Sequence, residues 1–117
     1  MATKAITINE ISVDQYEHNV ATWETLANAD DGSPFQGPSR KRISVQIGGV
    51  FGAGGNVIIE GSNDGVTYST LDDLDGNALA TITASGLYQV RDMAEYVRPR
   101  VSAGDGTTAI VATLVAA

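Results

Sequence analysis

The chain of 117 residues contains no cysteine, few aromatic residues (6%), and only seven basic residues against fourteen acidic ones. The lack of cysteine excludes disulfide bonds and thiolate metal sites. The net charge of −7 disfavours partners that carry phosphate, both nucleic acid and anionic membranes, because an acidic surface does not replace their counterions. No apolar run has the length of a signal-peptide core or a membrane span. We therefore expect one soluble domain over residues 1–117, made in the cytoplasm.

Glycine, in contrast, is abundant (13 residues), and it separates short stretches in which apolar and polar residues alternate. In Asn56–Leu71 the alternation is interrupted by Asn63-Asp64-Gly65, three residues that tolerate positive φ and favour a tight turn. The same pattern recurs in Tyr96–Ser102 and Thr107–Val115, on either side of Ala103-Gly104-Asp105-Gly106. The sequence therefore predicts two β-hairpins.

Alternation predicts further strands at Lys4–Ile8, Val20–Leu26, Lys41–Val50 and Leu87–Val90. Pro99 cannot donate a backbone hydrogen bond, so its strand should lie at a sheet edge or carry a bulge. Thr107–Val115 is apolar or small on both faces, as a central, fully covered strand or a strand in a subunit contact would be. The polar stretch Glu10–Asn19 favours a loop over a short helix. About eight short strands joined by Gly and Asp turns indicate an all-β fold, an antiparallel β-sandwich or jelly roll.

Residues 27–42 show no alternation and include two prolines and two glycines. A connection this long is uncommon inside a compact domain, so we expect an extended loop or arm that reaches a partner. Phe35 is the one large apolar side chain within it. The arm ends in three bases, which favour contact with an acidic protein surface, although a solvated strand start is the plainer interpretation. The candidate partner contacts are Phe35, Arg40, Lys41, Arg42, Arg98 and Arg100.

The sequence contains no motif for catalysis, a cofactor or a metal. Gly48–Gly55 lacks the Lys-Ser/Thr and the following helix of a phosphate-binding loop, so a hairpin loop is expected. The acids of Asp72–Asn77 lack EF-hand spacing and are typical of a turn. His18 is the only histidine, and no Gly-x-Ser-x-Gly elbow accompanies it. A glycosidase pair of carboxylates is not excluded by spacing alone, but we expect no enzyme.

Two resemblances add to this interpretation. The stretch Ile59–Tyr68, Ile-Glu-Gly-Ser-Asn-Asp-Gly-Val-Thr-Tyr, resembles a hairpin of discoidin-type, galactose-binding-like sandwiches. It implies a carbohydrate-binding or adhesion module as an alternative, in which Trp23, Tyr68 or Tyr88 would stack on sugar. Core or interface positions are the simpler expectation for Trp23 and Tyr88.

The second resemblance covers most of the chain. It rests on Thr22–Leu26, Asp31–Pro34, Arg42–Gln46, Gly52–Gly55, Glu60–Gly65, Gly86–Gln89, Tyr96–Val101 and Gly104–Thr108, in that order. This layout resembles small virion structural proteins of tailed bacteriophages, of the head decoration (cement) type. The likeness implies an all-β protein of the virion, on the outside of the capsid, that binds the major capsid protein as a homo-oligomer, a dimer or trimer. A tail or fibre-base component remains an alternative.

Overall fold

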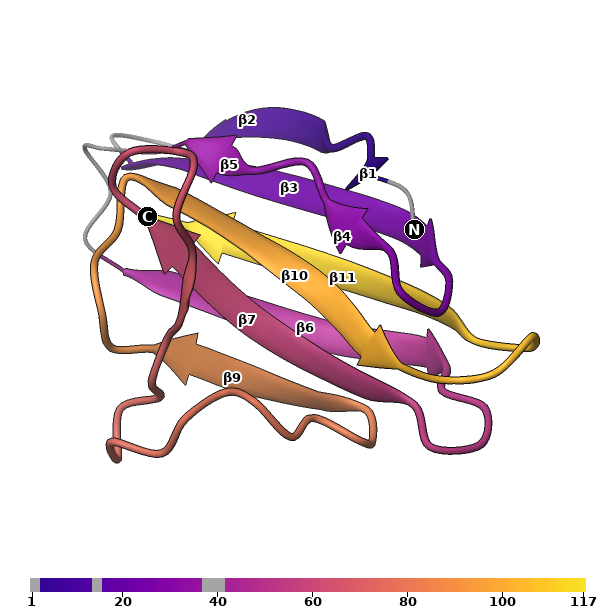
Figure 1. Cartoon of the computed structure of the whole chain (residues 1–117). Helices are drawn as coiled ribbons and strands as arrows, with labels where there is room; N and C mark the ends of the chain where they lie inside the picture. Colours follow the sequence, from indigo (N-terminus) through magenta and orange to yellow (C-terminus); the bar gives the residue numbers. More distant parts are fainter. Residues whose placement is uncertain (1–2, 14–15, 37–41) are drawn as a thin grey trace.

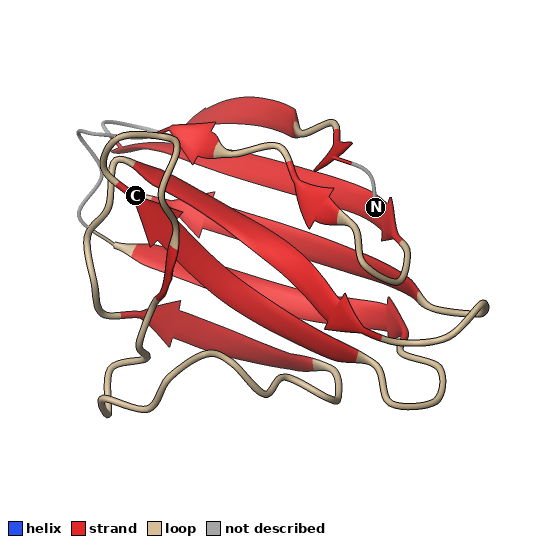
Figure 2. Cartoon of the chain, viewed as in Figure 1, coloured by secondary structure: helices blue, strands red, loops and turns tan. Residues whose placement is uncertain are grey.

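The computed structural model describes residues 3–13, 16–36 and 42–117, and this part of the chain contains β-strands and turns but no helix (Figure 2). No helix in it has the length and apolarity that a membrane crossing requires. The eleven strands are β1 (Thr3–Lys4), β2 (Thr7–Val13), β3 (Tyr16–Leu26), β4 (Asp31–Gly32), β5 (Phe35–Gln36), β6 (Ile43–Val50), β7 (Asn56–Ser62), β8 (Ser69–Thr70), β9 (Gly86–Val90), β10 (Tyr96–Ala103) and β11 (Ala109–Ala116).

The strands form two sheets that pack face to face (Figure 1). Sheet A has the order β1-β4-β10-β7-β8, with β5 also pairing with β10, and sheet B has the order β2-β3-β11-β6-β9. Every pair is antiparallel except β1 with β4. The predicted β-sandwich is confirmed. The strand number exceeds the expected eight because β1, β4, β5 and β8 have two residues each, too few to produce alternation in the sequence.

The predicted alternation builds the core. On β6, Val45 and Ile47 are 1% exposed, whereas the intervening Gln46 is exposed. Strand β11 is the central strand of sheet B, as predicted, and buries every second residue from Ile110 to Ala116. Its other side chains are not fully covered, since Val111 remains 37% exposed. The apolar faces of the two sheets meet in this core.

One of the two predicted hairpins is wrong. Strand β10 pairs with β7 in sheet A, whereas β11 pairs with β3 and β6 in sheet B. The Asp105-Gly106 turn therefore carries the chain from one sheet to the other, and so does the Gly48–Gly55 loop, which was also expected to be a hairpin loop. A reversal between sheets needs the same turn residues as a hairpin, so composition alone does not distinguish them. The other hairpin is confirmed: β7 and β8 pair at Glu60 with Thr70.

The N-terminal region also differs from the prediction. Lys4–Ile8 contains the end of β1 and the start of β2, which belong to different sheets. Most of the loop expected at Glu10–Asn19 is instead strand: residues 10–13 belong to β2 and residues 16–19 to β3, and the two strands pair up to Val13 opposite Tyr16. Residues 14–15 lie outside the described residues. The backbone conformation of this region is decided by pairing with a neighbouring strand. A polar composition gives no indication of that pairing.

Segment 27–36 is not the extended arm that the sequence predicted. Strands β4 and β5 lie along β10, and Phe35 is only 2% exposed within the core. Beneath them, the indole Nε1 of the fully buried Trp23 donates a hydrogen bond to the Ser33 carbonyl at 2.7 Å. The indole lies so close to Gly32 that a Cβ there would stand 2.7 Å from Nε1. The rest of the predicted arm, residues 37–41, lies outside the described residues.

Pro99 does not place β10 at a sheet edge, because β10 has β7 on one side and β4 and β5 on the other. The Val101 N–H donates to the Asp30 carbonyl, so the nitrogen two residues earlier, that of Pro99, points to the same side. On that side, the Pro99 nitrogen lies opposite the gap between β4 and β5, where the sheet needs no hydrogen-bond donor from β10. The sheet thus accommodates the proline by breaking the neighbouring strand. The bulge of β10 lies farther on, between Val101 and Ala103.

A second bulge, in β3, allows both Trp23 and Leu26 to face the core. Trp23 lies opposite Ala112 and Leu26 opposite Ile110, so two residues of β3 face one of β11. Strict alternation would turn Leu26 outward. Thr25 takes up the additional residue with φ of 59°, and both Trp23 and Leu26 are fully buried as a result.

The burial of Phe35 gives a stability prediction. Phe35→Ala should lower the free energy of unfolding by about 3–5 kcal/mol, because it empties a core position. Leu74→Ala, at a side chain that is 59% exposed, is the control and should change it by less than about 0.5 kcal/mol. Urea unfolding at pH 7 measures both, and equal stability of the two variants would contradict the burial of Phe35.

Candidate functional site

The structure separates the six predicted contact residues. Phe35 is corrected: its side chain lies in the core and is not available at the surface. Arg40 and Lys41 lie outside the described residues. Arg42 is exposed at the start of β6, where its backbone exchanges two hydrogen bonds with Ala117, at 3.0 and 2.9 Å. Of the predicted arm, Arg42 is therefore the described cation that faces solvent.

Arg98 and Arg100 point to the outer face of sheet A, as predicted, but both contact Glu60. Arg98 Nε lies 2.8 Å from Glu60 Oε1, and Arg100 Nε lies 3.2 Å from Oε2. Arg98 also lies 3.4 Å from Asp31 Oδ2, whose other oxygen accepts a hydrogen bond from the Thr3 hydroxyl. A partner would have to displace these contacts, so the two arginines primarily hold β10, β7 and β4 together.

This cluster follows from the register of two strands. Glu60 and Arg98 are directly opposite each other across β7 and β10, so their side chains emerge on one face. Glu60 is only 5% exposed, and a carboxylate this buried needs partners that neutralise it. The sequence places Glu60 on the outward face of its strand. It does not reveal the partner 38 residues away.

Two aromatic residues proposed for sugar stacking are already occupied. Trp23 is fully buried. The Arg98 guanidinium lies 3.8 Å above the centre of the Tyr68 ring and covers one of its faces. Burial raises the pKa of the Tyr68 hydroxyl, which has no hydrogen-bond partner within the described structure. Tyr88 packs half-buried against the core. No open stacking platform is present at Trp23, and the Tyr68 ring can offer only one face.

The exposed acids mainly organise turns. In the β10–β11 connection, the hydroxyl and N–H of Thr107 and the N–H of Ala53 donate to the Asp105 carboxylate. The Thr107 side chain, followed by the Ala53 N–H, lowers the pKa of Asp105 from 3.8 to about 2. In the β7–β8 turn, the N–H groups of Thr67 and Val66 lower the pKa of Asp64 likewise to about 2. Both carboxylates therefore stay ionised and rigidify their turns.

The acidic segment at Asp72–Asn77 is also a turn, as predicted. Asp73 Oδ1 accepts the N–H groups of Asp75 and Asn77, both at 2.9 Å, and Asp72 pairs with Arg91 at 2.8 Å. Among the side chains that the structure describes, no three acids or histidines converge as metal ligands. The side chain of His18 lies outside that description.

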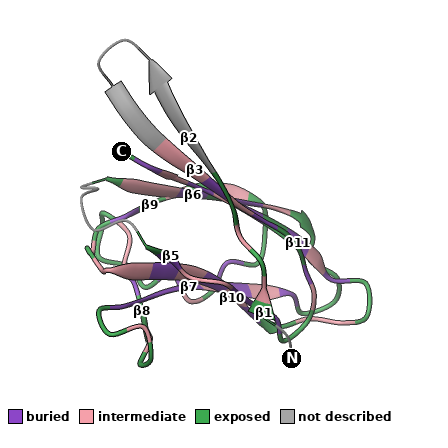
Figure 3. Cartoon of the chain, turned by 90° about the horizontal axis from the view of Figure 1, so that it is seen from above, coloured by how far each residue is buried: buried purple, intermediate pink, exposed green. Residues whose placement is uncertain are grey.

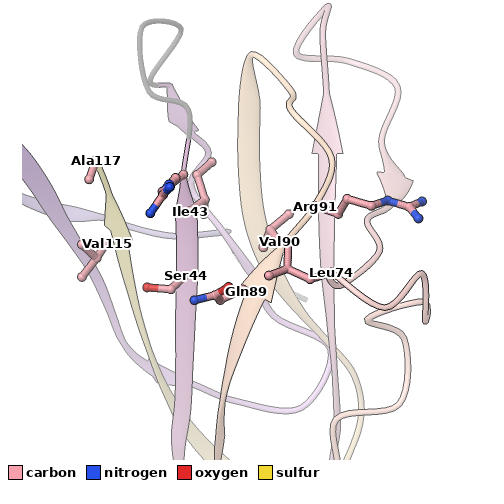
Figure 4. A pocket seen from close by; sticks show the side chains of 9 residues that line it. Ile43, Ser44, Leu74, Gln89, Val90, Arg91, Val115 and Ala117 are labelled. Carbon is pink, nitrogen blue, oxygen red and sulfur yellow. The ribbon is translucent and has the colours of Figure 1, made fainter.

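A shallow groove of about 550 Å³ opens beside Arg42 (Figure 4). It lies where β6, β9 and the end of β11 meet the Asp72–Asn77 turn. Its polar groups include Ser44 and Gln89, and Leu74, 59% exposed, borders it. Arg91 also lines the groove, but its guanidinium points away from it in Figure 4. That guanidinium pairs with Asp72 and Asp92. The cation that faces the groove is therefore Arg42. The sequence indicates Arg42 as a candidate contact, but it does not indicate the groove.

These observations define a β-sandwich with a shallow, mixed groove at one end. The fold is similar to that in the crystal structure of the SPBc2 prophage-derived protein YomS, with a TM-score of 0.66. The alignment covers 90% of this chain and 98% of that protein, at 13% sequence identity. At this identity the likeness establishes a shared fold. No protein-family model and no curated protein sequence matches the chain.

The buried position of Glu60 leads to a second stability prediction. Glu60→Gln should lower the free energy of unfolding by about 2–4 kcal/mol, because it leaves Arg98 and Arg100 side by side without their carboxylate. The matched control, Asp72→Asn, removes a surface pair whose side chains are 49% and 32% exposed and should cost less than about 1 kcal/mol. Chemical denaturation compares the two, and a smaller loss for Glu60→Gln than for Asp72→Asn would refute the structural role of the cluster.

The turn aspartates predict the acid dependence of stability. Their pKa values in the folded state lie below the ordinary 3.8, so their contribution is complete above pH 3.8 and is lost as the pH falls toward 2. The double variant Asp64→Asn/Asp105→Asn should have a lower Tm at pH 7 but a smaller fall in Tm between pH 5 and pH 2. Asp75→Asn, in a neighbouring exposed turn, is the control. An acid-induced fall as large in the double variant as in the wild type would exclude this explanation.

Proposed function

We propose that the protein is a non-enzymatic structural component of a bacteriophage virion, a capsid decoration protein that binds the major capsid protein on the outside of the head. The shared fold with a prophage-derived protein supports a phage context. The order of motifs along the chain supports the decoration type. The protein would be made in the host cytoplasm and join the virion during assembly.

The observation that carries the proposal is that one exposed base, unlike the other described bases, has no ion-pair partner within the described structure. Of the five bases in the described part of the chain, Lys4, Arg91, Arg98 and Arg100 are ion-paired within the molecule. Arg42 has no ion-pair partner among the described residues and is exposed beside the groove. A chain with a net charge of −7 thus presents an unpaired cation next to a shallow, partly apolar surface. That combination suits a protein partner with an acidic patch.

The remaining polar chemistry supports a binding role rather than catalysis. The buried carboxylates Asp30, Asp31 and Glu60 are engaged in structural contacts with neighbouring strands and loops. Asp64 and Asp105 cap their own turns. Each of these groups already stabilises the fold.

The test is cosedimentation of the purified protein with capsids assembled without it, over a series of salt concentrations. We expect saturable binding at a fixed number of copies per capsomer, weakening as salt screens the charges. Arg42→Glu should weaken binding by about tenfold or more, which corresponds to about 1.4 kcal/mol. The matched control is Thr81→Glu/Thr83→Glu, which makes the same charge change of −2 at two exposed positions and should bind like the wild type.

The two possible failures differ. Absence of binding to capsids at any salt concentration would overturn the decoration role and favour a tail or adhesion component. Binding that Arg42→Glu and the control reduce equally would retain that role and reject Arg42 as a contact.

A further inference from the structure

The two sheets lie as separate layers and do not close into a barrel (Figure 3). The sandwich therefore has four edges, formed by β8 and by β1 with β5 in sheet A, and by β2 and β9 in sheet B. An edge strand presents backbone N–H and C=O groups with which another chain can pair, and most proteins shorten, cover or charge their edges for this reason. Three of the four edges have such protection here, and β2 does not.

The three protected edges are short or covered. Strands β1, β5 and β8 have only two residues each. At the edge of sheet B that β9 forms, Asp73 pairs with Val90, and the Arg91 N–H donates to the Asp72 carbonyl at 2.9 Å. The turn that contains these two aspartates thus closes one end of β9 and leaves only a short stretch of it exposed to pairing.

Strand β2 is long, regular and unprotected. It has seven residues, and among the described strands it pairs with β3 alone. The pairs run from Thr7 opposite Thr22 to Val13 opposite Tyr16 without a register shift, so no bulge twists the strand away. Its sequence, Thr-Ile-Asn-Glu-Ile-Ser-Val, contains no proline, glycine or lysine. The edge of β2 therefore offers a regular backbone to an added strand.

The hydrogen-bond pattern of sheet B determines which backbone groups of β2 face outward. Arg42 and Ala117 exchange two backbone hydrogen bonds, so the odd-numbered residues of β11 bond to β6 and its even-numbered residues bond to β3. Carried across β3 by the register, the same alternation makes the odd-numbered residues of β2 bond to β3. The N–H and C=O groups of Ile8, Glu10 and Ser12 therefore point away from β3, toward the free edge.

We propose that β2 receives an extended segment of the major capsid protein, which adds to sheet B as a sixth strand. This inference rests on the proposed function for the identity of the partner. The three outward residues of β2 present three N–H and three C=O groups at a repeat of about 6.8 Å. An extended main chain offers acceptors and donors at the same repeat, and its backbone hydrogen bonds supply affinity in this mode of recognition.

The charge of β2 favours a different protein over a second copy as the added strand. Glu10 occupies the middle position of β2, so twofold antiparallel pairing over the whole strand would place Glu10 opposite Glu10 of the other copy. Like charges directly opposite each other destabilise a pair of strands, and two molecules of charge −7 repel each other as a whole. A strand of another protein with an uncharged or basic residue at that position meets no such cost.

The position of β2 suits a protein that connects capsid subunits. The groove beside Arg42 lies between β6 and β9, whereas β2 forms the opposite edge of sheet B. From β2 to β9 the sheet spans roughly 19 Å, at about 4.8 Å between neighbouring strands. One capsid subunit at the groove and a strand of its neighbour at β2 therefore occupy separate surfaces. The edge thus supplies the second contact by which a single copy holds two capsid subunits together.

The experiment is cosedimentation of the intact protein with capsids assembled without it. Ile8→Pro/Ser12→Pro removes two of the outward N–H groups and leaves the hydrogen bonds to β3 in place, as proline permits at an edge. We expect this variant to bind about 30-fold more weakly, because two main-chain hydrogen bonds to the capsid segment are lost. The matched control Ile8→Ala/Ser12→Ala shortens the same side chains, keeps both N–H groups and should bind like the wild type. Far-UV circular dichroism and melting curves confirm that each variant is folded.

Hydrogen exchange of the wild type, measured by mass spectrometry with and without capsids, decides the question even if the proline variant does not fold. The peptide that covers residues 7–13 should gain protection at about three amides on binding, those that face the free edge. Absence of wild-type binding to capsids would overturn the decoration role and this inference with it. Binding that the folded proline variant retains, or that leaves residues 7–13 without added protection, would overturn the edge contact alone. Protection that rises with protein concentration in the absence of capsids would assign the edge to a second copy and overturn the inference as well.

Discussion

The indole of Trp23 connects the two sheets, and much of the molecule depends on its position. It belongs to β3 of sheet B, yet its Nε1 holds the Ser33 carbonyl in the segment that completes sheet A. Gly32 allows this approach because any side chain would collide with the ring. With the segment held there, Asp31 comes opposite Arg100 and Phe35 comes opposite Val97. The anchored segment covers one side of β10, because both β4 and β5 pair with it there.

The ion-pair cluster on sheet A follows from the same anchor. Asp31 contacts Arg98 only because β4 lies beside β10. Glu60 lies between two arginines, and its burial makes their charges necessary to the fold. The positive charge of this face is therefore used internally, and Arg42 is the exposed base that has no ion-pair partner among the described residues.

The elements that the sequence predicted well are those with local signals. Val45 and Ile47 alternate with polar neighbours, and Asn63-Asp64-Gly65 marks a true hairpin, because side-chain periodicity and turn chemistry are encoded within a few residues. Other features depend on distant contacts. Asp105-Gly106 predicts a turn but not which sheet follows it. Phe35 lies in a strand of two residues, too short for periodicity, so its burial became visible only with Val97 beside it.

The candidate site also combines features that the local sequence indicates with features that depend on distant contacts. An exposed base such as Arg42 is recognisable from its neighbours in sequence, whereas the groove beside it requires three separated strands and a turn. The internal use of Arg98 and Arg100 requires Glu60, far away in the chain. The outer face of sheet B has no sequence motif, because its Thr, Val and Gln residues become one surface only through the register of the strands.

The proposed capsid contact is limited by its small charge. One exposed arginine contributes at most about 1 kcal/mol to a contact, which by itself would not keep a protein on a capsid. The apolar part of the groove beside Arg42, where Leu74 is 59% exposed, therefore has to supply further affinity through buried area. The proposed attachment thus depends on the combination of one exposed cation with a mixed polar and apolar surface, and not on a strongly charged patch.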